Sequence, residues 1–166
     1  MCPGTAAGTF DPDAHVYKNQ DYPAVRDGMM GAIRLMRAIN PRLRILLTVS
    51  PVPLTATMSG QHVLVASMHS KSILRAVAGQ LSAEHAGIDY FPSYELFNSP
   101  VFRGMFFAPN QRNVSRQGVD FVMQNFFGGL ERKSAQSRAV AQAARKAALD
   151  ATICEEELLA AFGSKR

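Results

Sequence analysis

The sequence predicts an α/β domain with few parallel strands, followed by Ala-rich helices. Two short apolar runs, at residues 44–52 (RILLTVSPV) and 88–91 (IDYF), alternate with longer segments of helical periodicity. Continuous apolar runs bounded by chain breakers are typical of strands buried on both faces of a parallel sheet, and helix–strand alternation is typical of βαβ units. From residue 130 onward Ala, Arg and Gln are frequent, and all three have high helix propensity.

The first 40 residues predict an irregular lead-in followed by one amphipathic helix. Residues 1–20 are rich in Gly, Pro, Asp and Asn and show no hydrophobic period. Asp21 is the expected N-cap of the helix, and Asn40-Pro41 ends it because the residue before a proline avoids the helical region. The apolar residues of the expected buried face recur every three or four positions: Val25, Met29, Ile33, Met36 and Ile39.

The segment between the two strands predicts a loop and a second helix. The loop is dense in Pro, Thr, Ser and Gly, and residues 62–66 (HVLVA) fit either a short strand or the lead into a helix. The helix is expected from about residue 70 to residue 83. Its expected buried face consists of Ile73, Leu74, Val77 and Leu81. A further turn or short helix is expected at residues 94–97, after the second strand.

Three helices are predicted after an irregular segment at residues 98–114. The first is capped by Ser115 and ended by Gly128-Gly129. The second runs from Arg132 to about Asp150, and a capping box of Thr152 and Glu155 begins a last short helix that ends near Phe162. The residues expected to be buried on the first of these helices are Val119, Val122, Met123 and Phe126.

The predicted organisation is therefore a lead-in (1–20), an α/β domain (21–129) and a helical extension (130–166). Two strands are few for such a domain, because a doubly wound sheet has about five and unpaired apolar edges invite association. We expect either a further strand within residues 1–20 or 98–110, or a second copy or partner chain that completes the sheet.

Composition and charge narrow the classes of function. No apolar run approaches the ~18–20 residues that a membrane span needs, and the opening lacks the basic and apolar regions of a secretory signal. A cytoplasmic protein, or one exported within an assembly, is expected. The net charge of +5 is spread along the chain without interleaved aromatic residues, which favours solvated helix faces over nucleic-acid binding. Cys2 and Cys154 have no C-x-x-C or histidine neighbours, so neither a metal site nor a cofactor is expected.

Four segments, in the order LLTVSPVPLTAT, SKSILRAVAG, DYFPSYELF and GVDFVMQNFF, resemble the GSCFA family. The lead-in PGTAAGTFDP and the run INPRLRILLTVSPVPL are similar to the middle section of that family, so the resemblance covers roughly residues 3–127. The family is similar to the SGNH (GDSL-like) hydrolases. The resemblance therefore implies part of a flavodoxin-like, three-layer fold and an acyl-ester hydrolase or acyltransferase that acts on acylated carbohydrates or similar esters.

The resemblance also implies that catalytic elements are missing. The Gly-Ser-Cys-Phe-Ala motif, which carries the presumed nucleophile, does not occur in this sequence, so a truncated frame, one gene of a split pair or a reduced relative is expected. The Asp-x-x-His pair of SGNH-like enzymes corresponds here to Asn110 and Asn113. An amide cannot accept a proton near neutral pH, and no histidine occurs from residue 86 to 166. We therefore expect no catalytic residue in this chain, which leaves a domain inactive on its own or a non-catalytic glycan-binding or structural subunit.

Seven residues are candidates for ligand binding. Ligands of open α/β sheets collect at the carboxyl ends of strands. Ser50 follows the first predicted strand. Its hydroxyl either lines a pocket or forms hydrogen bonds with backbone groups of a proline-rich turn. Glu95 follows the second, and it is expected to hold a sugar hydroxyl, to pair with Arg112 or to serve as a first-turn acid of a helix. The full set is Ser50, Ser93, Tyr94, Glu95, Asn110, Arg112 and Asn113.

Overall fold

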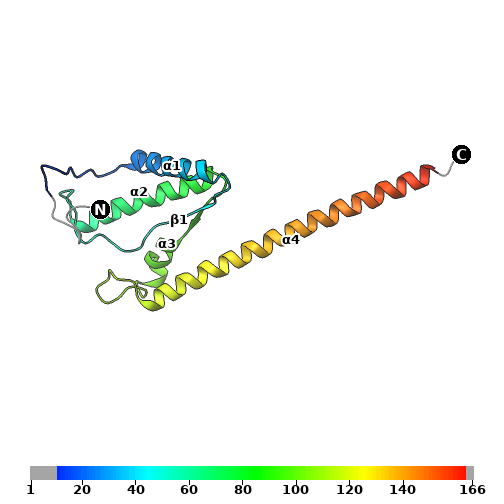
Figure 1. Ribbon diagram of the computed structural model, residues 1–166. Helices are drawn as coiled ribbons and strands as arrows, with labels where there is room; N and C mark the ends of the chain where they lie inside the picture. Colours follow the sequence, from blue (N-terminus) through cyan, green and yellow to red (C-terminus); the bar gives the residue numbers. More distant parts are fainter. Residues whose placement is uncertain (1–10, 164–166) are drawn as a thin grey trace. The chain divides into compact units, whose positions relative to one another are not determined.

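The computed structural model describes the backbone of residues 11–163 and the side chains of residues 11–144. The chain forms two compact units, Met1–Gly118 and Val119–Arg166. Figure 1 shows the elements in chain order. They are α1 (Tyr22–Ile39), β1 (Ile45–Thr48), α2 (Val63–Glu84), β2 (Ile88–Phe91), α3 (Ser93–Asn98), the 3-10 turn η1 (Pro100–Phe102) and α4 (Arg116–Gly163).

The two strands form a small parallel sheet, which confirms the α/β class and both predicted strands. β1 pairs with β2 in a register that runs from Ile45 opposite Ile88 to Thr48 opposite Phe91. β1 is shorter than the predicted 44–52. Its partner ends before Pro92, which has no N–H for the ladder.

Within the described residues the sheet has two strands. The expectation of a strand at 98–110 is wrong, because that segment forms η1 and a loop with one isolated antiparallel bridge between Phe107 and Val114. Residues 11–20 also contain no strand, and residues 1–10 lie outside the described part.

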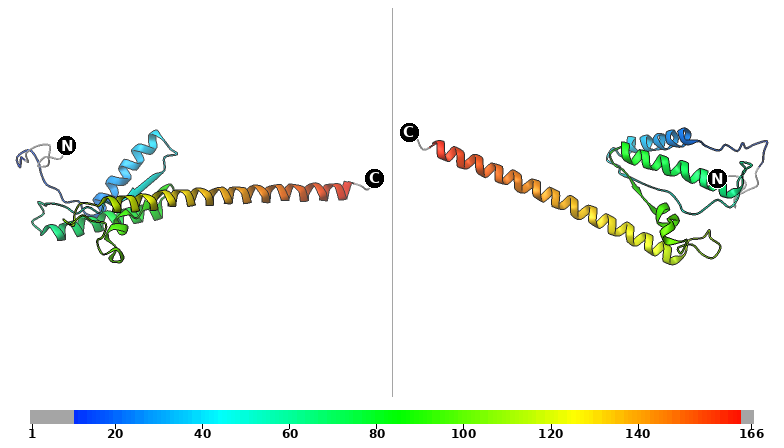
Figure 2. Two further views of the ribbon diagram at one scale, coloured as in Figure 1. Left: turned by 90° about the horizontal axis from the view of Figure 1, so that it is seen from below. Right: turned by 180° about the vertical axis from the view of Figure 1, so that it is seen from behind.

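Helices α1 and α2 lie side by side, as Figures 1 and 2 show. Asp21 caps α1 as predicted, with its Oδ1 accepting a hydrogen bond from the Ala24 N–H at 3.0 Å. The core between these helices and the sheet contains Ile33, Val77, Leu81 and Ile88, all less than 4 % exposed. Because side chains alternate along a strand, Ile45 and Leu47 of β1 also face this core.

The opposite face of β1 is not buried, which corrects the prediction of a strand buried on both faces. Leu46 keeps 46 % of its surface exposed, because the helices that build the core pack on the Ile45–Leu47 side. The helix faces were also predicted too wide. Met36 and Ile39 near the end of α1 and Leu74 in the middle of α2 are exposed, so only part of each predicted face packs in the core.

Helix α2 begins earlier than predicted, at Val63, which decides the open question at residues 62–66 in favour of helix. His62 is its N-cap, and the ring Nδ1 accepts a hydrogen bond from the Leu64 N–H at 3.3 Å. Arg37 ties the turns beside the sheet together, because its guanidinium donates to the carbonyl oxygens of Leu43 (3.3 Å) and Ala86 (3.2 Å).

The C-terminal segment is one continuous helix, α4, rather than the three predicted helices. Ser115 caps it as expected, with Oγ accepting from the Gly118 N–H at 3.1 Å. The predicted stop at Gly128-Gly129 is wrong. Both glycines stay helical, because a glycine costs only ~1 kcal/mol in a helix and strong helix formers follow. The helix also runs through Thr152 without a break, while the side chains of the predicted capping box lie outside the described part.

Only part of the predicted buried face of α4 is buried in the structure. Val122 is buried, but Val119 and Met123 are more than 40 % exposed.

A second, aromatic core surrounds the first turn of α4 within the unit Met1–Gly118. The rings of Phe97 and Phe106 meet edge to face with centroids 5.9 Å apart, and Phe102 lies 5.0 Å from Phe106. Gly118 is buried against this cluster. A Cβ at Gly118 would lie 2.8 Å from the Phe106 carbonyl oxygen and from Cε1 of Phe97.

Replacing Gly118 by alanine should therefore destabilise the protein despite the better helix propensity of alanine. We expect a loss of about 1–3 kcal/mol in the free energy of unfolding, because a backbone oxygen cannot move aside cheaply. Urea denaturation followed by circular dichroism measures it. Gly129→Ala is the matched control, since nothing lies within 4 Å of its Cβ position, and it should stabilise α4 by up to about 1 kcal/mol. Equal effects of the two variants would contradict the close approach.

Candidate functional site

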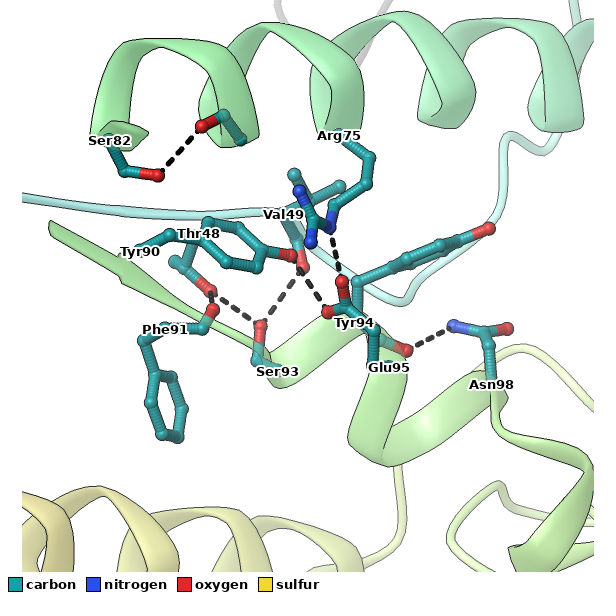
Figure 3. A network of polar contacts seen from close by, with 11 residues as sticks. Thr48, Val49, Arg75, Ser82, Tyr90, Phe91, Ser93, Tyr94, Glu95 and Asn98 are labelled. Atoms are coloured by element: carbon teal, nitrogen blue, oxygen red, sulfur yellow. Dashed lines mark hydrogen bonds and ion pairs between the residues drawn. The ribbon is translucent and has the colours of Figure 1, made fainter. Parts of the chain in front are cut away.

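The candidate site lies at the carboxyl ends of β1 and β2, where Ser93 joins the two strands (Figure 3). Its Oγ donates to the carbonyl oxygen of Val49 at 2.9 Å, directly after β1. It also lies 2.6 Å from Oγ1 of Thr48. Thr48 in turn reaches the carbonyl oxygen of Phe91, at the end of β2, at 3.0 Å. The sequence prediction placed Ser93 at this edge but missed Thr48.

Thr48 and Ser93 each carry one hydroxyl proton, whereas the two hydroxyl oxygens make three close contacts, so only two of the three contacts can be hydrogen bonds at one time. When Ser93 donates to Val49, Thr48 donates to Ser93; when Thr48 donates to Phe91, Ser93 donates to Thr48. In both arrangements the hydroxyls act as a further cross-link at the end of the sheet. We call Thr48 and Ser93 the hydroxyl clamp.

Glu95 is held by side chains from two other elements. Arg75 of α2 donates from Nε to Oε1, and Tyr90 of β2 donates from its hydroxyl to Oε2 at 2.8 Å. The Arg75 guanidinium also lies over the Tyr90 ring, 4.2 Å from its centroid. Figure 3 shows the three side chains converging between α2 and α3. We call Arg75, Tyr90 and Glu95 the carboxylate triad.

Each member of the triad stabilises the protonation state that its partners need. Burial alone would raise the pKa of Glu95, but the hydrogen bonds from Arg75 and Tyr90 outweigh it and lower the pKa. Burial, followed by the bond to Glu95, raises the pKa of Tyr90 well above its usual range. The bond to Glu95 raises the pKa of Arg75. At neutral pH Glu95 is therefore an ionised acceptor, and Tyr90 stays a donor.

The pairing of Glu95 corrects one of the alternatives drawn from the sequence, since the carboxylate binds Arg75 rather than Arg112. Sequence reasoning missed Arg75 and Tyr90 as members of the site. The available signal was weak: Arg75 interrupts the apolar stretch ILRAV, and Tyr90 is the polar-tipped member of the strand IDYF.

Ser50 and Tyr94 lie beside the same edge, and each takes part in a hydrogen bond to a nearby residue in the sequence. Ser50 Oγ accepts from the Val52 N–H at 3.2 Å, which is the turn geometry that sequence analysis left open beside a pocket role. The backbone carbonyl of Tyr94 accepts from the Asn98 amide at 3.0 Å within α3.

The other three candidates lie on a tight loop between Phe107 and Val114. Oδ1 of Asn110 accepts from the N–H groups of Arg112 (3.1 Å) and Asn113 (2.9 Å), which fixes the loop as an Asx turn. Asn113 accepts from the Ala108 N–H through its backbone carbonyl at 2.7 Å.

Arg112 extends from this loop to the loop after β1. Its Nη2 donates to Oγ1 of Thr55 at 2.6 Å, whereas its Nε is buried and has no hydrogen-bond partner among the residues that the structure describes. The seven predicted residues therefore divide into a strand-end group and a loop group.

Two further findings concern metals and membranes. Among the described residues, no three His, Cys, Asp or Glu side chains gather as metal ligands would. None of the helices in the described part is long and apolar enough to cross a membrane.

A family model of the GSCFA family matches residues 2–126. The chain belongs to the GSCFA family. The matched range agrees closely with the segments from which the resemblance was drawn, and in this GSCFA chain it includes all seven candidate residues. Comparison with curated proteins and with solved structures gave no match.

The carboxylate triad predicts a pH dependence of stability. The pKa of Glu95 is lower in the folded chain than its unfolded value of about 4.3, so the unfolded state binds the extra proton. The stabilisation is then complete above that value and is lost as the pH falls through the folded pKa. Since both partners are partly exposed, we expect Glu95→Gln to cost about 1 kcal/mol at pH 7.

Thermal melts of the wild type and of Glu95→Gln between pH 2.5 and 7 test this expectation. The two melting temperatures should converge at the acidic end. Glu131→Gln, on the exposed surface of α4, is the control and should follow the wild type throughout. A gap between wild type and Glu95→Gln that stays constant with pH would mean that the carboxylate charge does not stabilise the fold.

Proposed function

We propose that this chain supplies the ligand-binding wall of a GSCFA-type, SGNH-like acyl-ester hydrolase or acyltransferase domain, and that it is catalytically inactive alone. The ligand is an acylated carbohydrate. The observation that carries the proposal is the parallel pairing of β1 and β2, which brings the polar residues after both strands to one edge of the sheet. Open α/β sheets bind ligands at that edge.

The chemistry of the edge suits a sugar ester. An ionised carboxylate has about four acceptor positions, and the two bonds to Glu95 leave capacity for sugar hydroxyl donors. Arg112 offers the complementary group, since the terminal nitrogens of its guanidinium carry further N–H donors besides the Nη2–Thr55 bond that suit an acyl carbonyl oxygen. Ser50, Ser93, Tyr94, Asn110 and Asn113 complete the proposed wall.

Inactivity follows from what the candidate residues already do. The Ser93 hydroxyl shares its proton with Thr48 and the Val49 carbonyl, and these oxygens are far too weakly basic to activate a nucleophile. Asn110, which stands where the resemblance would place the orienting Asp, uses its Oδ1 to hold two backbone N–H groups. In this proposal, nucleophile and base come from a different segment or chain.

A second candidate function is a non-catalytic glycan-binding or structural subunit of a larger assembly. The observation that favours it is the exposed face of β1, where Leu46 would be buried if another chain packed on that face of the sheet. In both proposals a partner or a second copy completes the sheet.

Hydrolysis of p-nitrophenyl acetate by the purified chain tests the inactivity. We expect a rate no higher than that of a solution of free amino acids of the same composition. Turnover that a serine-reactive phosphonate abolishes would show that a complete serine site exists in the chain, and would overturn this part of the proposal.

Binding is tested separately by NMR titration with an O-acetylated oligosaccharide, with the saponified oligosaccharide as a reference. Amide shifts are expected at residues 93–95 and 110–113, and they should be larger for the acetylated form. Arg112→Gln should weaken binding about tenfold, the equivalent of ~1.4 kcal/mol for one charge-assisted hydrogen bond. Arg138→Gln on α4 is the matched control and should leave binding unchanged. Shifts scattered over the surface would contradict the wall.

A further inference from the structure

Helix α4 carries a regular apolar repeat that the proposed function does not use. Positions spaced alternately by four and three residues run along the whole helix. Eleven of these thirteen positions are apolar, and we call the set the α4 seam: Val119, Met123, Phe126, Leu130, Lys133, Ser137, Val140, Ala144, Ala147, Ala151, Cys154, Leu158 and Ala161.

Four large apolar residues of the seam are exposed in the part whose side chains the structure describes, whereas Phe126 is half-buried. Leu130 is 49 % exposed and Val140 is 64 % exposed, and Val119 and Met123 each exceed 40 %. A helix in water draws most of its stability from packing of its apolar face, so an exposed seam of this length indicates a partner.

The spacing identifies the partner as another helix. A straight α-helix drifts by about 20° per seven residues relative to a strict 3.5-residue repeat, so a sustained seven-residue repeat stays on one face only when two helices supercoil. Between residues 129 and 148 the residues that flank the seam are small or uncharged, which fits close approach: Gly129, Ser134, Gln136, Ala141, Ala143 and Ala148. Charged residues such as Glu131, Arg132 and Arg138 lie on the remaining positions, away from the seam.

The charge pattern along α4 identifies the partner as a second copy in antiparallel orientation. Residues 131–146 contain five basic residues and one acidic residue, whereas residues 150–157 contain four acidic residues and no basic residue. A parallel pair would set like charges against each other and would place Lys133 opposite Lys133. An antiparallel pair centred near residue 145 sets the acidic stretch against residues 134–141, which brings Glu157 next to the seam residue Lys133 of the other copy.

We propose that α4 forms an antiparallel coiled coil with α4 of a second copy of this chain. The seam then meets itself in layers that match large residues with small ones, such as Leu130 with Ala161 and Val140 with Ala151. In this register the paired layers run from residue 130 to residue 161, a length of about 48 Å at 1.5 Å per residue. The association uses residues outside both the hydroxyl clamp and the carboxylate triad, so it does not depend on the proposed function.

Light scattering after size exclusion measures the association of the full chain. We expect a dimer of twice the 18.1 kDa chain mass. Val140→Glu should weaken the dimer at least a hundredfold, because it buries a charge in the seam. Ala139→Glu adds the same charge to the neighbouring exposed position off the seam, and it should leave the dimer intact. Circular dichroism checks that both variants keep their helix. A monomeric wild type, or equal behaviour of the two variants, would overturn the proposal.

Disulfide trapping determines the orientation. In the antiparallel pair residue 137 meets residue 154, so oxidation of Ser137→Cys should join the peptide that contains residue 137 to the peptide that contains Cys154. Within one helix these positions are about 25 Å apart and cannot be bridged. Mass spectrometry of the digested dimer identifies the linked peptides. A disulfide between two copies of residue 137 would show parallel pairing and would overturn the antiparallel arrangement.

Discussion

A parallel pair of four-residue strands is stable here because two helices bury the same face of it. Parallel strands cannot be joined by a tight turn, so the chain must cross over, and α2 is that crossover. α1 then packs beside α2, and Ile33, Val77, Leu81 and Ile88 fill the space between helices and strands. The other features of this unit follow from that arrangement: the strand ends meet at one edge, and the opposite face of β1 stays accessible at Leu46.

The polar groups at the strand ends serve the fold and the proposed ligand site together. The hydroxyl clamp continues the cross-linking of the sheet beyond its last backbone pair, and the carboxylate triad connects α2, β2 and α3 through one charged group. Glu95 is held by a cation and a phenol, so its orientation is set before any ligand arrives. Preorganised acceptors of this kind reduce the ordering cost of binding.

The elements with strong local signals were predictable from the sequence. Asp21 and Ser115 as caps, β2 at 88–91 and the parallel pairing all follow from short-range rules of capping, periodicity and crossover. The continuity of α4 was not, because Gly128-Gly129 also matches a helix end, and only the long helix-forming sequence on both sides decides against it. The open face of β1 was not predictable either. An apolar run shows that both faces of a strand are suited to burial, but it does not show whether this chain has elements that pack on both faces.

The sequence predicted where the candidate residues lie in the fold, but it did not predict which side chains they contact. Strand-end logic placed Ser93 and Glu95 correctly at one edge. It could not reveal that Arg75, twenty residues earlier on α2, is the cation beside Glu95, because that contact depends on how α2 crosses the sheet. Arg112 shows the same limit, since its contact with Thr55 spans 57 residues of sequence.

The hydroxyl clamp can hold its two protons in two different arrangements, which a single hydrogen bond cannot. Both arrangements of Thr48 and Ser93 keep the strands joined, yet their O–H dipoles point in opposite senses along the edge. Rotation of two hydroxyls is enough to exchange them, with no movement of the backbone. Both protons stay within the clamp in either arrangement, so the two arrangements differ in which strand end, Val49 or Phe91, receives a hydroxyl proton.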